Sequence, residues 1–257
     1  MSMKHVASRD NPTFRELLGL AQKPRERRRA RQTLLDGEHL LQAALEAGQT
    51  PRLLVFAEQL PSAQVEAWCA RLPTVPALTL ADQLFAALSP VDSPSGLLAL
   101  IDIPAPAAAA EDGFLLLLED VQDPGNLGAI LRVAAAAGGR RVCLSKGCAE
   151  AWSPKCLRGG QGAQFQLAIE EGADLPALAR AYAGPVYAGL LGAADSLYSL
   201  DLRGPVGFAF GNEGAGLSAP LREACRPFII PMPGRVESLN VATAAAVCLF
   251  ERVRQIS

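Results

Sequence analysis

The feature that most constrains the fold is the run of five apolar residues Phe114–Leu118 (FLLLL), which precedes a helical pattern at residues 127–137. A strand with apolar residues on both faces is typical of a parallel sheet covered by helices on both sides. Short apolar runs and helical segments continue to alternate through the rest of the chain. The predicted strands are 114–118, 141–144, 165–169, 186–190, 206–210 and 227–230. The predicted helices are 127–137, 154–157, 175–182, 220–224 and 238–256. This pattern predicts a doubly wound parallel α/β domain, which binds ligands beyond the carboxyl ends of its strands.

The first half of the chain shows a similar alternation on a smaller scale. Helical patterns occupy residues 11–22, 38–47, 62–71 and 82–88, and strand-like segments occupy 52–57, 74–80 and 96–101. Residues 1–103 are therefore predicted to form a small α/β domain. Residues 104–113 hold two prolines, four consecutive alanines and two acidic residues, and we predict a linker there. The second domain is predicted to span residues 114–257.

The net charge of −2 by itself argues against a nucleic-acid partner, but the charges are unevenly distributed along the chain. Residues 1–36 hold nine basic and four acidic residues, a net charge of +5, and the rest of the chain carries −7. The basic excess is densest at residues 23–31 (KPRERRRAR). Two interpretations remain open, a solvated helix face and an arm that contacts phosphates.

Composition also bears on compartment and on metal binding. The sequence has no apolar stretch of about 18 residues and no apolar core of a signal peptide, so neither a membrane span nor a leader is predicted. The six cysteines show no CxxC spacing, and the two histidines, His5 and His39, lie far from them. We therefore expect reduced thiols, no metal site and a cytoplasmic protein.

Three loops, each directly after a predicted strand, carry the chemical information. They are residues 119–132 (EDVQDPGNLGAILR), 210–218 (FGNEGAGLS) and 229–240 (IIPMPGRVESLN). Each alone has a plain structural interpretation, as a helix N-cap or a tight turn. The acid Glu213 in the glycine-rich loop disfavours phosphate and suits a cationic or hydroxyl-bearing ligand. The second half contains no histidine, which excludes a Ser-His-Asp triad there.

Taken together and in this order, the loops resemble the SpoU (TrmH-like) family of RNA ribose methyltransferases within the SPOUT superfamily. The matching segments are Asn126-Leu127-Gly128 with Arg132, Gly211-Asn212-Glu213-Gly214 with Gly216-Leu217-Ser218, and Ile230-Pro231-Met232 with Ser238-Leu239-Asn240-Val241. In the first half, SRDNP at 8–12, the arginine-rich stretch and LLDGEHLLQAAL at 34–45 resemble the family's RNA-binding domain, which is similar to ribosomal protein L30e. Residues 155–165 match only loosely, and their role stays open.

The resemblance implies a C-terminal domain with a deep trefoil knot, a homodimer formed through that domain, and S-adenosyl-L-methionine as cofactor. It implies that Arg132 orients and activates the ribose hydroxyl. Because arginine is effectively always protonated, we expect Arg132 to stabilise the developing alkoxide. Whether it also accepts the proton stays open. The implied catalytic residues are Arg132, Asn126, Glu213, Ser238 and Asn240. The implied cofactor-binding residues are Gly211, Ile230, Met232 and Leu239. The implied RNA-binding residues are Arg25, Arg27, Arg28, Arg29 and Arg31.

The function that follows is S-adenosylmethionine-dependent 2′-O-methylation of a ribose in structured RNA. An L30e-like first domain favours 23S ribosomal RNA as substrate, and transfer RNA is the alternative within the family. A non-catalytic RNA-binding protein with the same fold is a second alternative. An unrelated nucleotide-binding α/β enzyme is a third, disfavoured because no P-loop or GxGxxG motif is present.

Overall fold

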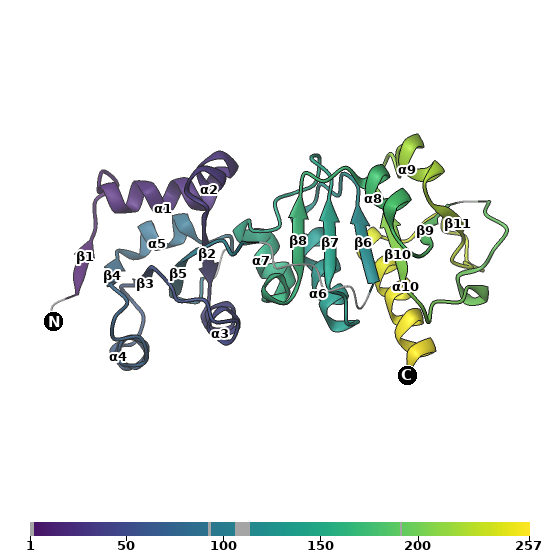
Figure 1. Ribbon diagram of the computed structural model, residues 1–257. Helices are drawn as coiled ribbons and strands as arrows, with labels where there is room; N and C mark the ends of the chain where they lie inside the picture. Colours follow the sequence, from purple (N-terminus) through teal and green to yellow (C-terminus); the bar gives the residue numbers. More distant parts are fainter. Residues whose placement is uncertain (1–2, 92–93, 106–113, 191) are drawn as a thin grey trace. The chain divides into compact units, whose positions relative to one another are not determined.

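The computed structural model describes residues 3–91, 94–105, 114–190 and 192–257, which fall into two compact units (Figure 1). The first unit holds residues 3–105 and the segment Trp152–Phe165, and the second holds the rest of the described chain. Each unit is built around one sheet with helices packed on it, which confirms the α/β class. Most of the predicted linker, residues 106–113, lies outside the described residues.

The first unit is a five-stranded mixed sheet in the order β1-β4-β3-β5-β2, in which β5 runs antiparallel to both of its neighbours. Its strands are β1 Lys4–Val6, β2 Gln32–Asp36, β3 Leu53–Ala57, β4 Ala77–Leu80 and β5 Leu97–Asp102. Its first five helices are α1 Pro12–Gln22, α2 Pro24–Ala30, α3 Glu38–Glu46, α4 Ser62–Arg71 and α5 Asp82–Leu88. Apolar side chains of α1 and α5 form the core on one face of the sheet, and α3 and α4 lie on the other face (Figure 1). The sequence patterns predict neither β1 nor β2.

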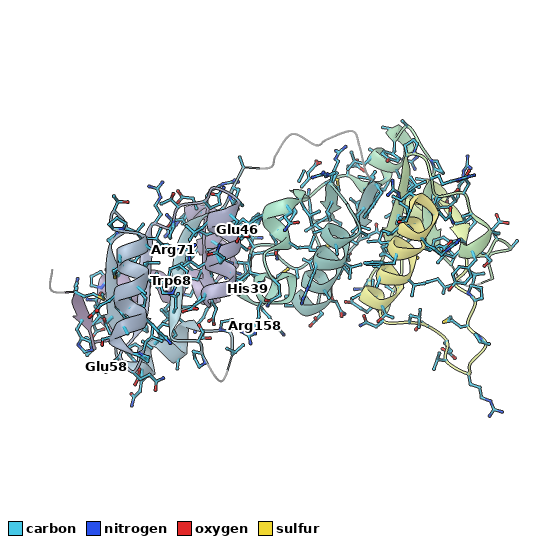
Figure 2. All side chains as sticks on the ribbon, turned by 90° about the horizontal axis from the view of Figure 1, so that it is seen from below. His39, Glu46, Glu58, Trp68, Arg71 and Arg158 are labelled. Carbon is cyan, nitrogen blue, oxygen red and sulfur yellow. The ribbon has the colours of Figure 1, made fainter. Side chains whose placement is uncertain are left out.

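Polar contacts join α3 and α4 to each other. The Trp68 indole of α4 donates a hydrogen bond of 3.0 Å to the Glu38 carboxylate at the start of α3. The guanidinium of Arg71, one turn further along α4, lies 4.9 Å from the centre of the Trp68 ring (Figure 2). It also donates to the side-chain oxygen of Gln42 on α3. The two helices are therefore held as a pair on this face of the sheet.

The segment Trp152–Phe165 leaves the second half of the chain and packs in the first unit. Its helix α7, Pro154–Gly160, lies against β2, where the buried Thr33 hydroxyl donates a hydrogen bond of 2.6 Å to the Trp152 carbonyl. The Phe165 ring packs edge-on against Trp152, with centroids 5.6 Å apart. Phe165 lies in the 3-10 helix Ala163–Gln166. The strand predicted at 165–169 is therefore wrong in its first half, because β8 spans Ala168–Glu171. The aromatic contact depends on tertiary packing, which a local pattern does not contain.

The second unit is a six-stranded sheet in the order β11-β9-β10-β6-β7-β8, and every pair in it is parallel, as predicted. Its strands are β6 Phe114–Leu118, β7 Arg141–Leu144, β8, β9 Val186–Gly189, β10 Val206–Phe210 and β11 Arg226–Phe228. Its α-helices are α6 Pro124–Ala136, α8 Leu175–Ala181, α9 Ala219–Glu223 and α10 Val241–Ile256.

The buried strand β6 has helices on both of its faces. Leu115 and Leu117 pack in one cluster with residues of α8 and α9. On the opposite face the guanidinium of Arg252, on α10, lies 5.5 Å from the centre of the Phe114 ring. Helices α6 and α10 pack against each other. The fully apolar composition of this strand is therefore explained by burial on two sides.

Candidate active site

The three loops singled out in the sequence emerge at the same edge of the second sheet, because β6, β10 and β11 run parallel to one another. From β6 the chain first adds β7 and β8 on one side and then β9, β10 and β11 on the other. The order therefore reverses between β6 and β10, where Leu118 pairs with Phe210. Open parallel sheets bind ligands beyond the carboxyl ends of the strands at such a point.

Helix α6 begins at Pro124, three residues before the predicted start. Asp123 is its N-cap, and its carboxylate accepts a hydrogen bond of 2.8 Å from the Asn126 backbone N–H. Because Asp123 supplies the cap, Asn126 lies within the first turn and its side chain is not needed there. Asn126 is therefore not the N-cap of this helix.

The side chain of Asn126 joins the three loops. Its amide nitrogen Nδ2 donates to Glu213 Oε1 at 2.9 Å, and its Oδ1 accepts from Asn240 Nδ2 at 3.0 Å. Asn240 is also the N-cap of α10, accepting from two backbone N–H groups of the first turn, so that helix begins at Val241 rather than 238. We call this chain of three side chains the Asn126 bridge. It brings together three of the predicted catalytic residues, one from each loop.

The carboxylate of Glu213 is stabilised in its charged form. Partial burial acts to raise its pKa, but the hydrogen bond from Asn126 and those from nearby backbone N–H groups outweigh burial, and the net pKa is lowered. Glu213 is therefore ionised at neutral pH and is a poor proton acceptor. The geometry assigns it to holding the Asn126 amide.

Arg132 lies on the exposed face of α6. It follows Asn126 by six residues, which on an α-helix is about 9 Å along the axis and roughly 120° around it. Within the described residues no hydrogen bond or ion pair engages its guanidinium. The structure thus leaves Arg132 outside the Asn126 bridge, with its donors directed to solvent.

A cavity of about 180 Å³ lies beside the third loop. Four of the predicted site residues line it, namely Ile230, Met232, Ser238 and Leu239, together with Gly189, Leu190, Ile229, Glu237 and Ala244. The walls are mostly apolar, and the side chains of Glu237 and Ser238 supply polar groups. Gly211 does not line this cavity. It stands at the base of the second loop, where an added Cβ would collide with the Gly216 backbone.

The predicted RNA-binding arginines separate into two groups. Arg27 is only 5% exposed, and its guanidinium donates to the carbonyls of Leu20 at 2.7 Å and Ala21 at 3.2 Å. It therefore satisfies the carboxyl end of α1 and is not among the residues we propose to contact RNA. The other four, Arg25, Arg28, Arg29 and Arg31, are exposed on or beside α2, with Arg29 paired to Glu26 at 2.6 Å.

Two polar residues at this edge of the sheet stand in the quoted loops but were not among the predicted site residues. Glu119 binds Ser218 through both of its carboxylate oxygens, and Asn212 donates from its side chain to the Asp120 carbonyl at 2.9 Å. The position of Glu119, immediately after an apolar strand, was an available signal. What hid the pairing is that its partner follows 99 residues later.

Both halves of the chain match models of known protein families. The model of the SpoU rRNA Methylase family matches residues 113–250, more than half of the chain. The chain belongs to the SpoU rRNA methylase family. A second model, the MRM3-like substrate binding domain, matches residues 11–99, within the first unit. The resemblance drawn from the three loops and from the first half is confirmed.

SpoU relatives of known name cover nearly the whole chain. It is 34% identical over 97% of its length to an uncharacterized tRNA/rRNA methyltransferase of Synechocystis, of which 93% is covered. It is 31% identical over 96% of its length to the 23S rRNA (guanosine(2553)-2′-O)-methyltransferase RlmP of Bacillus subtilis, of which 98% is covered. A solved structure, the AdoMet-bound rRNA methyltransferase of Sinorhizobium meliloti, superposes with a TM-score of 0.82 at 30% identity and covers 99% of each chain.

Within the ranges that the structure describes, this SpoU member shows neither a membrane-spanning helix nor a metal cluster. No helix within those ranges is long and apolar enough to cross a bilayer. The same residues contain no group of three or more His, Cys, Asp or Glu side chains placed to hold a metal ion.

Proposed function

We propose that this protein transfers a methyl group from S-adenosylmethionine to a ribose 2′-hydroxyl of ribosomal RNA, with 23S rRNA as the substrate. The observation that carries the proposal is the Asn126 bridge. It gathers Asn126, Glu213 and Asn240 from three loops, and the third of these loops also forms the wall of an apolar cavity. Membership of the SpoU family and the name of the Bacillus subtilis relative support the same reaction.

The residues around the cavity fit the chemistry of S-adenosylmethionine. Apolar side chains such as Ile230 and Leu239 suit an adenine ring or a thioether chain, and the Glu237 carboxylate suits a cationic group. When bound, this donor supplies a methyl group already activated by a positively charged sulfonium. The protein must therefore place the acceptor hydroxyl in line and stabilise negative charge on its oxygen.

Arg132 is the residue we propose for that second task. Its guanidinium is exposed, and no described carboxylate neutralises it, so its donors are available to a ribose oxygen or an adjacent phosphate. The Asn126 bridge holds three polar side chains in one geometry, and Ser238 contributes a hydroxyl at the cavity.

Substrate choice is proposed from the first unit. The exposed arginines Arg25, Arg28, Arg29 and Arg31 give RNA phosphates a basic surface on α2. The relatives named as rRNA methyltransferases favour ribosomal RNA over transfer RNA. With ribosomal RNA as substrate, we place the protein in the cytoplasm.

We further propose a homodimer formed through the second unit. Helix α10 leaves two large apolar side chains exposed, Phe250 at 49% and Ile256 at 48%, and a shared interface would remove both from water. The trefoil knot expected in the same unit from the family resemblance stays a prediction. Light scattering of the purified protein measures the oligomeric state, and a Phe250→Arg variant is expected to shift it to monomer.

The experiment that tests the function is methyl transfer from radiolabelled S-adenosylmethionine. The purified protein is incubated separately with 23S rRNA, 16S rRNA and total transfer RNA, and 2′-O-methylation is mapped by resistance to alkaline cleavage. We expect label in 23S rRNA only. Label in transfer RNA alone would replace the proposed substrate. Absence of both label and calorimetric binding of S-adenosylmethionine would favour a non-catalytic RNA-binding protein.

A further inference from the structure

The loop that carries Glu213, residues 211–218, is closed on itself. Asn212 and Gly216 exchange backbone hydrogen bonds of 3.1 and 2.9 Å. The side-chain oxygen of Asn212 also accepts from the backbone N–H groups of Gly214 and Ala215, both at 2.9 Å. The loop is therefore a compact turn with Glu213 within it. Such a turn has a fixed internal shape, but its direction depends on how its two ends are held.

Glu119, the first residue after β6, holds both ends. Its backbone N–H donates to the Phe210 carbonyl at 2.9 Å, where the loop leaves β10. Its carboxylate accepts from Ser218 at the far end, with Oε2 2.6 Å from the backbone nitrogen and Oε1 2.7 Å from the hydroxyl. Both carboxylate oxygens of Glu119 therefore accept hydrogen bonds from Ser218, and both bonds are short, as is typical of charge-assisted hydrogen bonds.

We propose that Glu119 is a positioning residue for methyl transfer, acting through Ser218. By fixing the two ends of loop 211–218 on the end of β6, it sets the place of Glu213, which in turn holds Asn126 at 2.9 Å. Glu119 touches neither reactant in this account. The inference rests on the proposed function for its kinetic consequence, but its structural consequence is independent of it.

The contact between Glu119 and Ser218 also has a purely structural explanation. Ser218 is the N-cap of α9, and its side chain makes no capping hydrogen bond within that helix. Glu119 could therefore serve only to stabilise the start of α9. That role predicts a loss of stability with an unchanged turnover number, whereas positioning predicts a fall in kcat in folded protein.

The test uses the full chain with four substitutions. Glu119→Gln exchanges one acceptor oxygen for an amide that faces a donor, Ser218→Ala removes the hydroxyl, and Ser218→Thr keeps it. Glu223→Gln is the matched control, because it removes an exposed carboxylate on α9 itself. We expect kcat to fall about 10- to 100-fold in Glu119→Gln and Ser218→Ala, with the KM values for S-adenosylmethionine and RNA changed less than about threefold. Ser218→Thr, which keeps the hydroxyl, should recover most of the kcat lost in Ser218→Ala, and the control Glu223→Gln should retain the wild-type kcat.

Amide hydrogen exchange gives a second readout that needs no activity. Exchange at Ser218, whose backbone N–H is bound by the Glu119 carboxylate, should accelerate about 10-fold in Glu119→Gln and not in Glu223→Gln. Gly214 and Ala215, whose N–H groups are bonded within the turn, should exchange as in wild type. Wild-type exchange at Ser218 in the folded Glu119→Gln variant would overturn the inference, as would a kcat within about twofold of wild type. If the wild-type protein methylates no RNA, the proposed function fails while the exchange experiment still decides the role of Glu119.

Discussion

Replacing Asn126 by Asp tests the Asn126 bridge with almost no change in shape. The new carboxylate can still accept from Asn240, but the donor Nδ2 becomes an oxygen facing Glu213 Oε1, 2.9 Å away in the wild type. One hydrogen bond to an ionised group is removed, and two negative charges are placed next to each other. Because the pKa of Glu213 is already lowered, both groups are charged at neutral pH in the absence of rearrangement.

The size of the effect follows from these two contributions. A hydrogen bond to a charged group contributes about 1.5–3 kcal/mol, and partial exposure of Glu213 favours the lower end. Repulsion between like charges about 4 Å apart adds from about 1 kcal/mol in water to about 4 kcal/mol near a protein surface. Relief by movement reduces the total, and we expect about 2–4 kcal/mol. If the bridge must be intact in the transition state, kcat falls about 30- to 1000-fold.

The assay is methyl transfer to RNA across the pH range from mildly acidic to mildly alkaline, with Asn126→Ala as the control. Two carboxylates that share a site bind one proton more readily than either alone, so their folded-state pKa is raised in the Asp variant. Its rate relative to wild type should therefore recover as the pH falls. The Ala variant adds no charge, and its rate ratio to wild type should not recover on acidification.

The loss of thermal stability in Asn126→Asp should also become smaller as the pH falls. In wild type the lowered pKa of Glu213 contributes stability above its unfolded pKa, and that contribution disappears as the pH falls through the folded pKa. In Asn126→Asp the raised pKa values act in the opposite direction, so the difference in Tm between the two proteins should narrow on acidification. An Asp variant with wild-type kcat at mildly alkaline pH, or one that matches Asn126→Ala at every pH, would refute the role of the bridge.

Three further changes test other parts of the molecule. Arg132→Ala should abolish methyl transfer while calorimetry shows nearly unchanged binding of S-adenosylmethionine, and near-normal turnover would remove Arg132 from the mechanism. Converting the exposed arginines of α2 to Gln should weaken RNA binding and reduce the slope of log K against log salt by about 0.7–0.9 for each phosphate that is no longer neutralised, as measured by filter binding; an unchanged slope would make α2 a solvated helix. The variants are Arg25→Gln, Arg28→Gln, Arg29→Gln and Arg31→Gln. Arg27→Met should instead lower the free energy of unfolding by about 2–3 kcal/mol in urea, because two carbonyls of α1 are deprived of a charged donor; unchanged stability would contradict its structural assignment.

The site was partly visible in the sequence because its residues lie at fixed positions relative to strand ends. Asn126, Glu213 and Asn240 each lie in a loop or helix start that follows an apolar strand, and parallel strands bring their carboxyl ends to one edge. Family resemblance was still needed to select these residues from other polar residues in the same loops. The Glu119–Ser218 contact was missed because nothing local links two residues 99 positions apart.

By itself the sequence determined the local and periodic features of this protein. The five apolar residues of β6 required burial on both faces, and the alternation that followed determined a parallel sheet, since backbone period and side-chain polarity are properties of short segments. Only the tertiary structure decided which arginine of α2 is buried, namely Arg27. It alone also decided that residues 152–165 pack in the first unit and that Asn126 links three loops. The physical reason is that burial and hydrogen-bond partnership depend on which distant segment arrives beside a residue, and side chains of the same type in one sequence stretch can meet quite different neighbours.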